Sequence, residues 1–189
     1  TAVTTTFFHW IQEHGFYSLL YLAQALSSSP PPEPLHLAGV FSFIDGLRLV
    51  ALRGKLMQEA AVASKGGMVA LIGADDAQAQ AVCDKAASGE ILVCANFNAP
   101  GQIVLSGHAT ACARAVEAAS AMGLRATALT VAGAFHSPLM KPAADQMGQA
   151  LANAAFQRPN IPVWSNVTGK PHDSADMELL KSLLVKQIV

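Results

Sequence analysis

The chain has 189 residues, of which 52 % are apolar and only 13 % are charged, so it can bury a substantial core in one domain or in a core with a small subdomain. Its formal net charge is −1 at pH 7, which leaves no excess of Lys and Arg for binding nucleic acid. The three cysteines are too few and too scattered in sequence to predict a disulfide framework or a zinc site: Cys83, Cys94 and Cys112. We therefore expect a protein of a reducing compartment, with core thiols and without a metal.

The first 34 residues contain no Lys or Arg and concentrate aromatic side chains, which fits neither a secretory signal nor an Arg-rich transit segment. Their apolar part, from Phe16 to Leu26, is shorter than the ~20 residues that a membrane-spanning helix needs, so we expect no membrane association. A stretch rich in Ser and Pro follows, from Ser27 to Pro34, and proline both lacks the backbone N–H and restricts the residue before it. Residues 1–36 are therefore predicted to form an atypical N-terminal helix and an irregular Pro-rich linker.

The next segment has the period of an amphipathic helix. Ser42 can cap its N-terminus, and Asp45 three residues later makes a variant of the capping box. Apolar residues then recur at helical spacing through about residue 61, at Phe43, Leu47, Val50, Ala51, Met57 and Ala60. Gly66 and Gly67 are expected to end this helix.

Residues 68–131 alternate between strand and helix patterns. Strands are predicted at 68–72, 91–95, 102–105 and 126–131, and helices at 75–88 and 110–122. An irregular loop, Asn96 to Gly101, is expected between the second and third strands. The order strand-helix-strand-strand-helix-strand is that of the split βαβ, or ferredoxin-like, module.

The C-terminal part is predicted to be mainly helical. An amphipathic helix is expected from Ser137 to Ala154, and a short strand at 162–164. A last helix from about Ser174 would bury Leu179, Leu180, Leu183, Leu184 and Ile188. Helices outnumber strands outside the ferredoxin-like module, which is typical of part of a larger α/β layer fold.

One histidine lies where a strand pattern meets the start of a helix. The strand at 126–131 leads to His136, and imidazole is the side chain whose ordinary pKa lies closest to neutral, so a histidine placed there is a natural general base. A single histidine at a helix start is more often structural, and Arg53 upstream would by default be a surface charge on an apolar stem. On these residues alone, both interpretations stay open.

Four motifs occur in order along the chain: Leu47–Val50 through Arg53–Gln58, Ala95–Gln102, Ala134–Ser137 and Ser165–Gly169. Together they resemble the malonyl-CoA:acyl-carrier-protein transacylase family over roughly residues 37–189. The resemblance implies an α/β fold: a partial α/β-hydrolase-like acyltransferase core, residues 37–66 and 133–189, with a ferredoxin-like (βαββαβ) subdomain, residues 67–132, inserted into it.

The same resemblance implies a malonyltransferase of fatty acid biosynthesis. Such an enzyme transfers malonyl from malonyl-CoA, through a seryl ester, to the phosphopantetheine thiol of acyl carrier protein, and no bound cofactor is implied. His136 would deprotonate the serine and later the thiol. Arg53 would hold the malonyl carboxylate with its rigid guanidinium. Asn98 and Gln102 would position the substrate. In related modules of polyketide synthases, a Phe directly before the His, as at Phe135, is associated with malonyl rather than methylmalonyl as the substrate.

The serine elbow of the family, Gly-x-Ser-x-Gly, has no counterpart in the sequence. Counting back from Arg53 by the family's usual separation leads to Ser28, where Leu26 and Pro30 stand in the places of the two glycines, and a linker serine is the simpler interpretation. The family's N-terminal Gly-Gln-Gly and C-terminal Gly-Pro-Gly segments are absent too. We therefore expect either a fragment or a diverged relative without activity.

A second hypothesis is a catalytically inactive module that binds acyl carrier protein or another subunit. Arg48, Arg53, Lys55 and Lys141 would contribute a basic patch for the acidic carrier. Hydrolysis of an unrelated ester would rest on the fold alone. The expected compartment is the cytoplasm in a bacterium, and the plastid stroma or mitochondrial matrix in a eukaryote.

Overall fold

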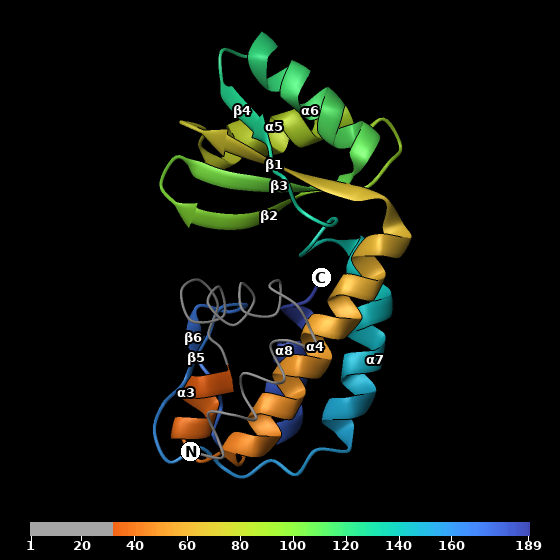
Figure 1. The fold of residues 1–189 in the computed structure, drawn as a ribbon. Helices are drawn as coiled ribbons and strands as arrows, with labels where there is room; N and C mark the ends of the chain where they lie inside the picture. Colours follow the sequence, from red (N-terminus) through yellow and green to blue (C-terminus); the bar gives the residue numbers. More distant parts are fainter. Residues whose placement is uncertain (1–31) are drawn as a thin grey trace, which may run out of the picture. The chain divides into compact units, whose positions relative to one another are not determined.

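The computed structural model describes residues 32–189, and these divide into two compact units (Figure 1). One unit contains residues 32–54 and 150–183, and the other contains residues 55–149 and 184–189. The helix predicted at 16–26 and the candidate Ser28 lie outside the described residues. The division of the chain at residues 36, 66 and 132 stays a prediction from the sequence.

The first described element is a short helix, α3 (Pro32–Leu37). The prediction of an irregular linker through Pro34 is wrong from Pro32 onward. Proline is tolerated in the first turn of a helix because the N–H groups there have no partner within the helix. Leu35 is buried, and its carbonyl accepts a hydrogen bond from the N–H of Val40 at 2.9 Å, so the chain folds back directly after the helix.

A long helix, α4 (Phe43–Ser64), follows the predicted cap. The Ser42 hydroxyl accepts a hydrogen bond from the N–H of Asp45 at 3.1 Å and donates one to its carboxylate at 2.6 Å. Phe43 was predicted on the buried face but is 53 % exposed. The buried apolar side chains of this helix lie in its second half: Leu56, Met57, Ala60 and Ala61.

The end of α4 differs from the prediction. Lys65, with a φ of 48°, ends the helix, and Gly66 and Gly67 already belong to the first strand. Gly66 serves close packing, because a Cβ atom added to it would clash with the side chain of Ala134 and lie 3.0 Å from the carbonyl oxygen of Gly107. Gly66 is therefore required by the packing of the strand, whereas a Cβ atom on Gly67 would meet its nearest neighbour, the Sγ atom of Cys112, at an ordinary 3.8 Å.

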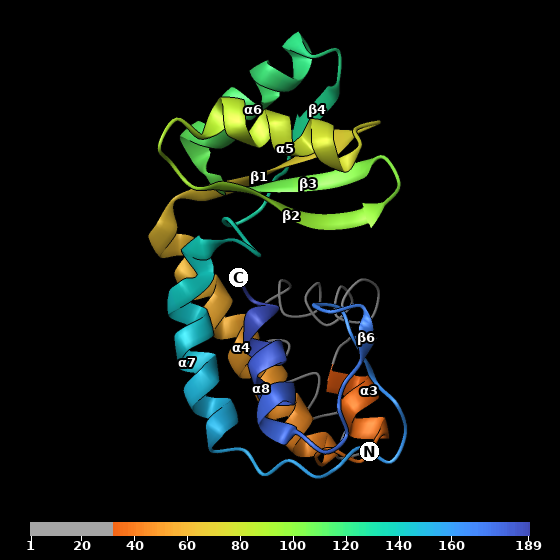
Figure 2. The same cartoon turned by 180° about the vertical axis from the view of Figure 1, so that it is seen from behind.

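The ferredoxin-like order predicted from the sequence is confirmed. The elements run β1 (Gly66–Ile72), α5 (Asp76–Ala87), β2 (Leu92–Ala99), β3 (Gln102–His108), α6 (Ala109–Ala121) and β4 (Arg125–Ala128). The four strands form one antiparallel sheet in the order β2-β3-β1-β4. Both helices lie on the same face of this sheet (Figures 1 and 2), and between them and the strands sits a core that includes Val69, Leu71, Val82, Leu105 and Ala115.

Several strand boundaries in this unit were predicted wrongly; β3, for example, was predicted to end at residue 105 but continues to His108. The segment Asn96 to Gly101 is not a loop: β2 continues to Ala99, and only Pro100 and Gly101 make the turn to β3. The pairing of β2 with β3 shifts register between Cys94 and Asn96 and again between Phe97 and Ala99. These shifts allow β2 to include the polar residues Asn96 and Asn98. At the other end, β4 stops at Ala128 and not at residue 131.

The remaining elements follow the predicted order, but the short strand expected at 162–164 lies at 164–165, and its partner strand was not predicted. A 3-10 turn, η1 (Pro138–Met140), leads into α7 (Lys141–Ala152), and a two-stranded antiparallel ribbon is formed by β5 (Trp164–Ser165) and β6 (Lys170–Pro171). The last helix is α8 (Met177–Lys186). Leu180, Leu183 and Ile188 are buried as predicted, but Leu179 is 42 % exposed.

Two general features of residues 32–189 bear on function. In this range no helix is both long enough and apolar enough to cross a membrane. In the same range no group of three or more His, Cys, Asp and Glu side chains is arranged to hold a metal ion.

Candidate active site

His136 lies in the connection between β4 and η1, and a backbone carbonyl orients its ring. The Nδ1 atom of His136 is 2.9 Å from the carbonyl oxygen of Gln187. A carbonyl oxygen can only accept a hydrogen bond, so Nδ1 must carry the proton. In the neutral ring, Nε2 is then the acceptor, and an oriented acceptor of this kind is what a general base requires.

The backbone of His136 is held in an uncommon conformation. Its φ is 55°, in the left-handed region that residues other than glycine seldom adopt. Such a conformation costs of order 1–3 kcal/mol and persists where the surrounding structure enforces it, as at active sites. The conformation therefore supports a functional role for this histidine in addition to the oriented ring.

The residues on both sides of His136 are anchored tightly. The buried Ser137 hydroxyl donates to the carbonyl of Ala134 at 2.7 Å and accepts from the N–H of Leu139 at 3.3 Å, which caps η1. Gly133 has no room for a side chain, since an added Cβ atom would lie 2.7 Å from the Cα atom of Ala61 in α4. The sequence Gly-Ala-Phe-His-Ser thus folds into a rigid turn that fixes the imidazole.

Gln187 was missed by the sequence analysis. Because the last carbonyls of a helix have no intrahelical donor, the end of α8 offers a free acceptor, and Gln187 comes directly after Lys186, the last residue of that helix. The sequence signal that could have found it is the helical period ending near the C-terminus.

The other predicted site residues lie at three places. Arg53 is a half-buried residue of α4, in the unit of residues 32–54 and 150–183. Asn98 is exposed in β2, and Gln102 is exposed at the start of β3, on the two sides of the Pro100–Gly101 turn. Since Ala99 pairs with Gln102, the hairpin brings Asn98 and Gln102 to the same end of the sheet. Their approach to His136, and that of Arg53, stays a prediction.

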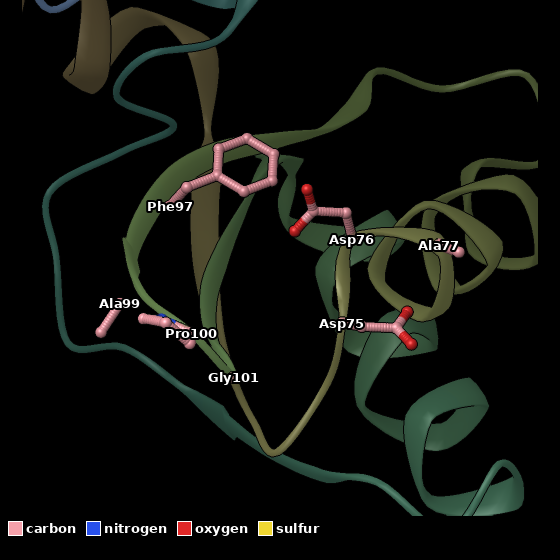
Figure 3. A pocket seen from close by; sticks show the side chains of 7 residues that line it. All are labelled: Asp75, Asp76, Ala77, Phe97, Ala99, Pro100 and Gly101. Atoms are coloured by element: carbon pink, nitrogen blue, oxygen red, sulfur yellow. The ribbon is translucent and has the colours of Figure 1, made fainter.

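An open hollow of about 720 Å³ lies beside this hairpin, between the β2–β3 turn and the start of α5 (Figure 3). It is lined by Asp75, Asp76, Ala77, Phe97, Ala99, Pro100 and Gly101. In Figure 3, the carboxylate of Asp76 points toward the ring of Phe97, while Asp75 points away; its carboxylate caps α5 by accepting from the N–H of Gln78 at 2.8 Å. The Asp76 carboxylate that faces the hollow would repel an acid-bearing thioester, so the hollow does not favour malonyl.

The fold and the histidine together define a mixed α/β protein with a ferredoxin-like unit and a histidine whose ring is oriented by a backbone carbonyl. Residues 34–181 match the family model of the acyl transferase domain, and the chain belongs to this family. The malonyl CoA-acyl carrier protein transacylase of Salmonella typhimurium is 41 % identical over 180 residues, which are 95 % of this chain and 57 % of that relative.

Solved structures agree with this assignment. The malonyl CoA-acyl carrier protein transacylase from Coxiella burnetii matches with a TM-score of 0.78 at 36 % identity, over 82 % of this chain and 49 % of that one. A malonyl-transacylase in complex with its type II PKS acyl-carrier protein matches with a TM-score of 0.76 at 41 % identity, over 82 % and 50 % of the two chains. The chain thus spans about half the length of the proteins that it resembles.

Proposed function

We propose that this chain takes part in the transfer of a malonyl group from malonyl-CoA to the phosphopantetheine thiol of acyl carrier protein, in fatty acid biosynthesis. The observation that carries the proposal is the His136 Nδ1 to Gln187 carbonyl contact at 2.9 Å, because it leaves Nε2 as a proton acceptor. Membership of the acyl transferase family and the names of the relatives support the choice of malonyl and of the carrier protein.

His136 would act twice as a base. Its Nε2 takes the proton of the nucleophilic serine as the hydroxyl attacks the malonyl thioester, and it returns that proton to the leaving thiolate of coenzyme A. It then deprotonates the phosphopantetheine thiol, which attacks the seryl ester; the bond between the acyl carbon and the serine oxygen breaks, and the imidazolium returns the proton to that oxygen. The Gln187 carbonyl, at the C-terminal end of α8, stabilises the imidazolium in each half-reaction because the negative end of the helix dipole lies there.

The remaining roles are proposed by residue type. Arg53 binds the malonyl carboxylate, since a guanidinium offers two parallel donors in a fixed plane. Asn98 and Gln102 position the thioester by hydrogen bonds. Ser28 is the proposed nucleophile. No cofactor other than the substrate thioester is required, and the bacterial relatives and three free thiols fit a reducing cytoplasm.

The test is an intact-mass measurement after mixing the chain with malonyl-CoA. A covalent malonyl adduct is expected, and it should disappear in Ser28→Ala and fall steeply in His136→Ala. Arg53→Ala should lose malonyl loading while the variant remains folded by circular dichroism. If the adduct survives in Ser28→Ala, the nucleophile is a residue other than Ser28. If neither the wild-type chain nor any variant forms an adduct, the proposed transfer activity of this chain is refuted.

The second candidate function is a carrier-binding module without activity, and the lack of a Gly-x-Ser-x-Gly elbow favours it. The charges do not favour this function, because three cations of the predicted basic patch are paired with acidic neighbours on their own helices. The pairs are Arg48 with Asp45, Lys55 with Glu59 and Lys141 with Asp145. A patch neutralised in this way attracts an acidic carrier weakly. Titration of carrier protein at two salt concentrations separates the hypotheses, because an electrostatic interface weakens as salt rises.

A further inference from the structure

Two cysteines that are apart in the sequence lie together in the ferredoxin-like unit. Cys83 is a buried residue of α5, Cys94 is a half-buried residue of the edge strand β2, and their Sγ atoms are 3.8 Å apart. Both thiols are reduced in this structure. The third cysteine, Cys112, is buried on α6, where its thiol faces the carbonyl of Gly107 at 3.9 Å.

We propose that Cys83 and Cys94 form an oxidisable dithiol, which a small disulfide or peroxide oxidant converts into an intramolecular disulfide. A disulfide has a sulfur–sulfur distance of about 2.05 Å, so each sulfur must move by roughly 0.9 Å from its place in the reduced form. A change of this size is within the reach of a small rotation about the Cα–Cβ bonds, without displacement of α5 or β2. The proposal does not depend on acyl transfer.

The environment of the pair assigns a role to each sulfur. The hydrogen bond from the Cys83 thiol lowers the pKa of Cys94, although burial and the nearby Asp76 and Asp84 oppose this effect. The same hydrogen bond, followed by burial, raises the pKa of Cys83. Cys94 is also the more accessible of the two, so it is the thiol that reacts first with an oxidant from solution.

The chemistry balances with glutathione disulfide as the oxidant. The Cys94 thiolate attacks one sulfur of glutathione disulfide, which forms a mixed disulfide and releases one glutathione thiolate. Cys83 then gives up its proton and attacks the Sγ atom of Cys94, which breaks the mixed disulfide and releases the second glutathione. In total, two protein thiols become one disulfide and glutathione disulfide becomes two glutathione thiols.

A disulfide between Cys83 and Cys94 would link the edge strand β2 covalently to α5. Among residues 32–189, β2 pairs with one neighbouring strand, and its first register shift lies just after Cys94. A covalent link to α5 at this point limits the opening of the β2–β3 hairpin that carries Asn98 and the Pro100–Gly101 turn. The oxidised form should therefore be the more rigid form of this hairpin.

The experiment uses the full chain, with Cys112→Ser as the matched background. After incubation with glutathione disulfide, acid quenching, unfolding and alkylation, the wild-type chain should carry one alkylated cysteine where the reduced chain carries three. Trypsin should then release residues 66–85 linked to residues 86–114, and in the Cys112→Ser background the only cysteine of the second peptide is Cys94. Dithiothreitol should restore the separate peptides.

Two further variants make the result decisive. Cys94→Ser and Cys94→Ala, each in the Cys112→Ser background, should show no linked peptides and should keep Cys83 as an alkylatable thiol. The proposal is wrong if the oxidised wild-type chain still carries three alkylated thiols, if Cys83 is linked to Cys112, or if the product is a stable glutathione adduct or a disulfide-linked dimer. None of these outcomes depends on malonyl transfer, so the test is independent of the proposed function.

Discussion

Replacement of Gly133 by alanine tests whether the turn that holds His136 depends on close packing against α4. A Cβ atom at this position would lie 2.6 Å from the Cβ atom of Ala61, 2.7 Å from its Cα atom and 3.0 Å from its carbonyl oxygen. Carbon atoms in contact prefer about 3.5–4.0 Å, so the turn and the helix must separate by roughly 1 Å. Because two of the three atoms belong to the backbone, no side-chain rotation can relieve the clash.

Overpacking of this kind costs about 1–3 kcal/mol. A central value of about 2 kcal/mol lowers the ratio of folded to unfolded chains by a factor of about 30. For a chain of this size, it lowers the midpoint of thermal unfolding by roughly 4–8 °C. Urea unfolding followed by far-ultraviolet circular dichroism should show a lower midpoint with an unchanged slope.

Gly148→Ala is the matched control. Gly148 lies within α7, and a Cβ atom added there meets only a methyl group of Val185 at 3.6 Å, which is ordinary contact. Alanine in the interior of a helix is favoured over glycine by about 0.5–1 kcal/mol, so this variant should be more stable than the wild type. If Gly133→Ala unfolds at the same urea concentration as the wild type or at a higher one, the close contact between the turn and α4 is wrong.

Three further variants test other parts of the structure by the same unfolding assay. Asp75→Ala removes the capping box of α5 and should cost about 1 kcal/mol, and equal stability would show that the cap does not form in solution. Leu105→Ala removes a fully buried side chain from β3 and should cost about 2–5 kcal/mol, and a cost below 1 kcal/mol would place Leu105 outside the core. His172 has a pKa lowered by burial, and its Nδ1 has no partner within the described residues, so the unfolded chain binds the proton more tightly. The contribution of His172 to the free energy of unfolding is constant above pH 6.5 and falls as the pH drops from 6.5 toward the lower pKa of the folded state. His172→Leu should remove this part of the pH dependence of the free energy of unfolding. An unchanged pH profile would contradict the prediction.

The ferredoxin-like unit could be predicted from the sequence because its strands and helices are short, alternate regularly and are each amphipathic or buried. Its boundaries could not, because a register shift has no period: Asn96 and Asn98 indicate a turn by residue type, yet the shifts accommodate them in β2. The end of α4 was misplaced for a related reason, since Lys65 adopts a positive φ that sequence preference assigns to the two glycines after it.

In the candidate site too, some residues could be predicted from the sequence and others could not. His136 was predicted because its motif is local, and its neighbours Ala134 and Ser137 hold the turn by contacts within a few residues. Gln187 was not predicted, because it acts through a backbone carbonyl that any residue would supply, 51 positions along the chain. The contact between Cys83 and Cys94 could not be predicted from the sequence either, because it follows from the packing of α5 on β2.

A carbonyl partner for His136 has a chemical consequence that a carboxylate would not have. Both half-reactions of the proposed transfer require the imidazole to accept a proton and to give it back to the leaving group, which is the thiolate of coenzyme A in the first and the serine oxygen in the second. A carboxylate at Nδ1 would hold the imidazolium with a full opposite charge, whereas the Gln187 carbonyl offers only a dipole, strengthened by its place after α8. The carbonyl therefore orients the ring through Nδ1 without placing a full negative charge beside it.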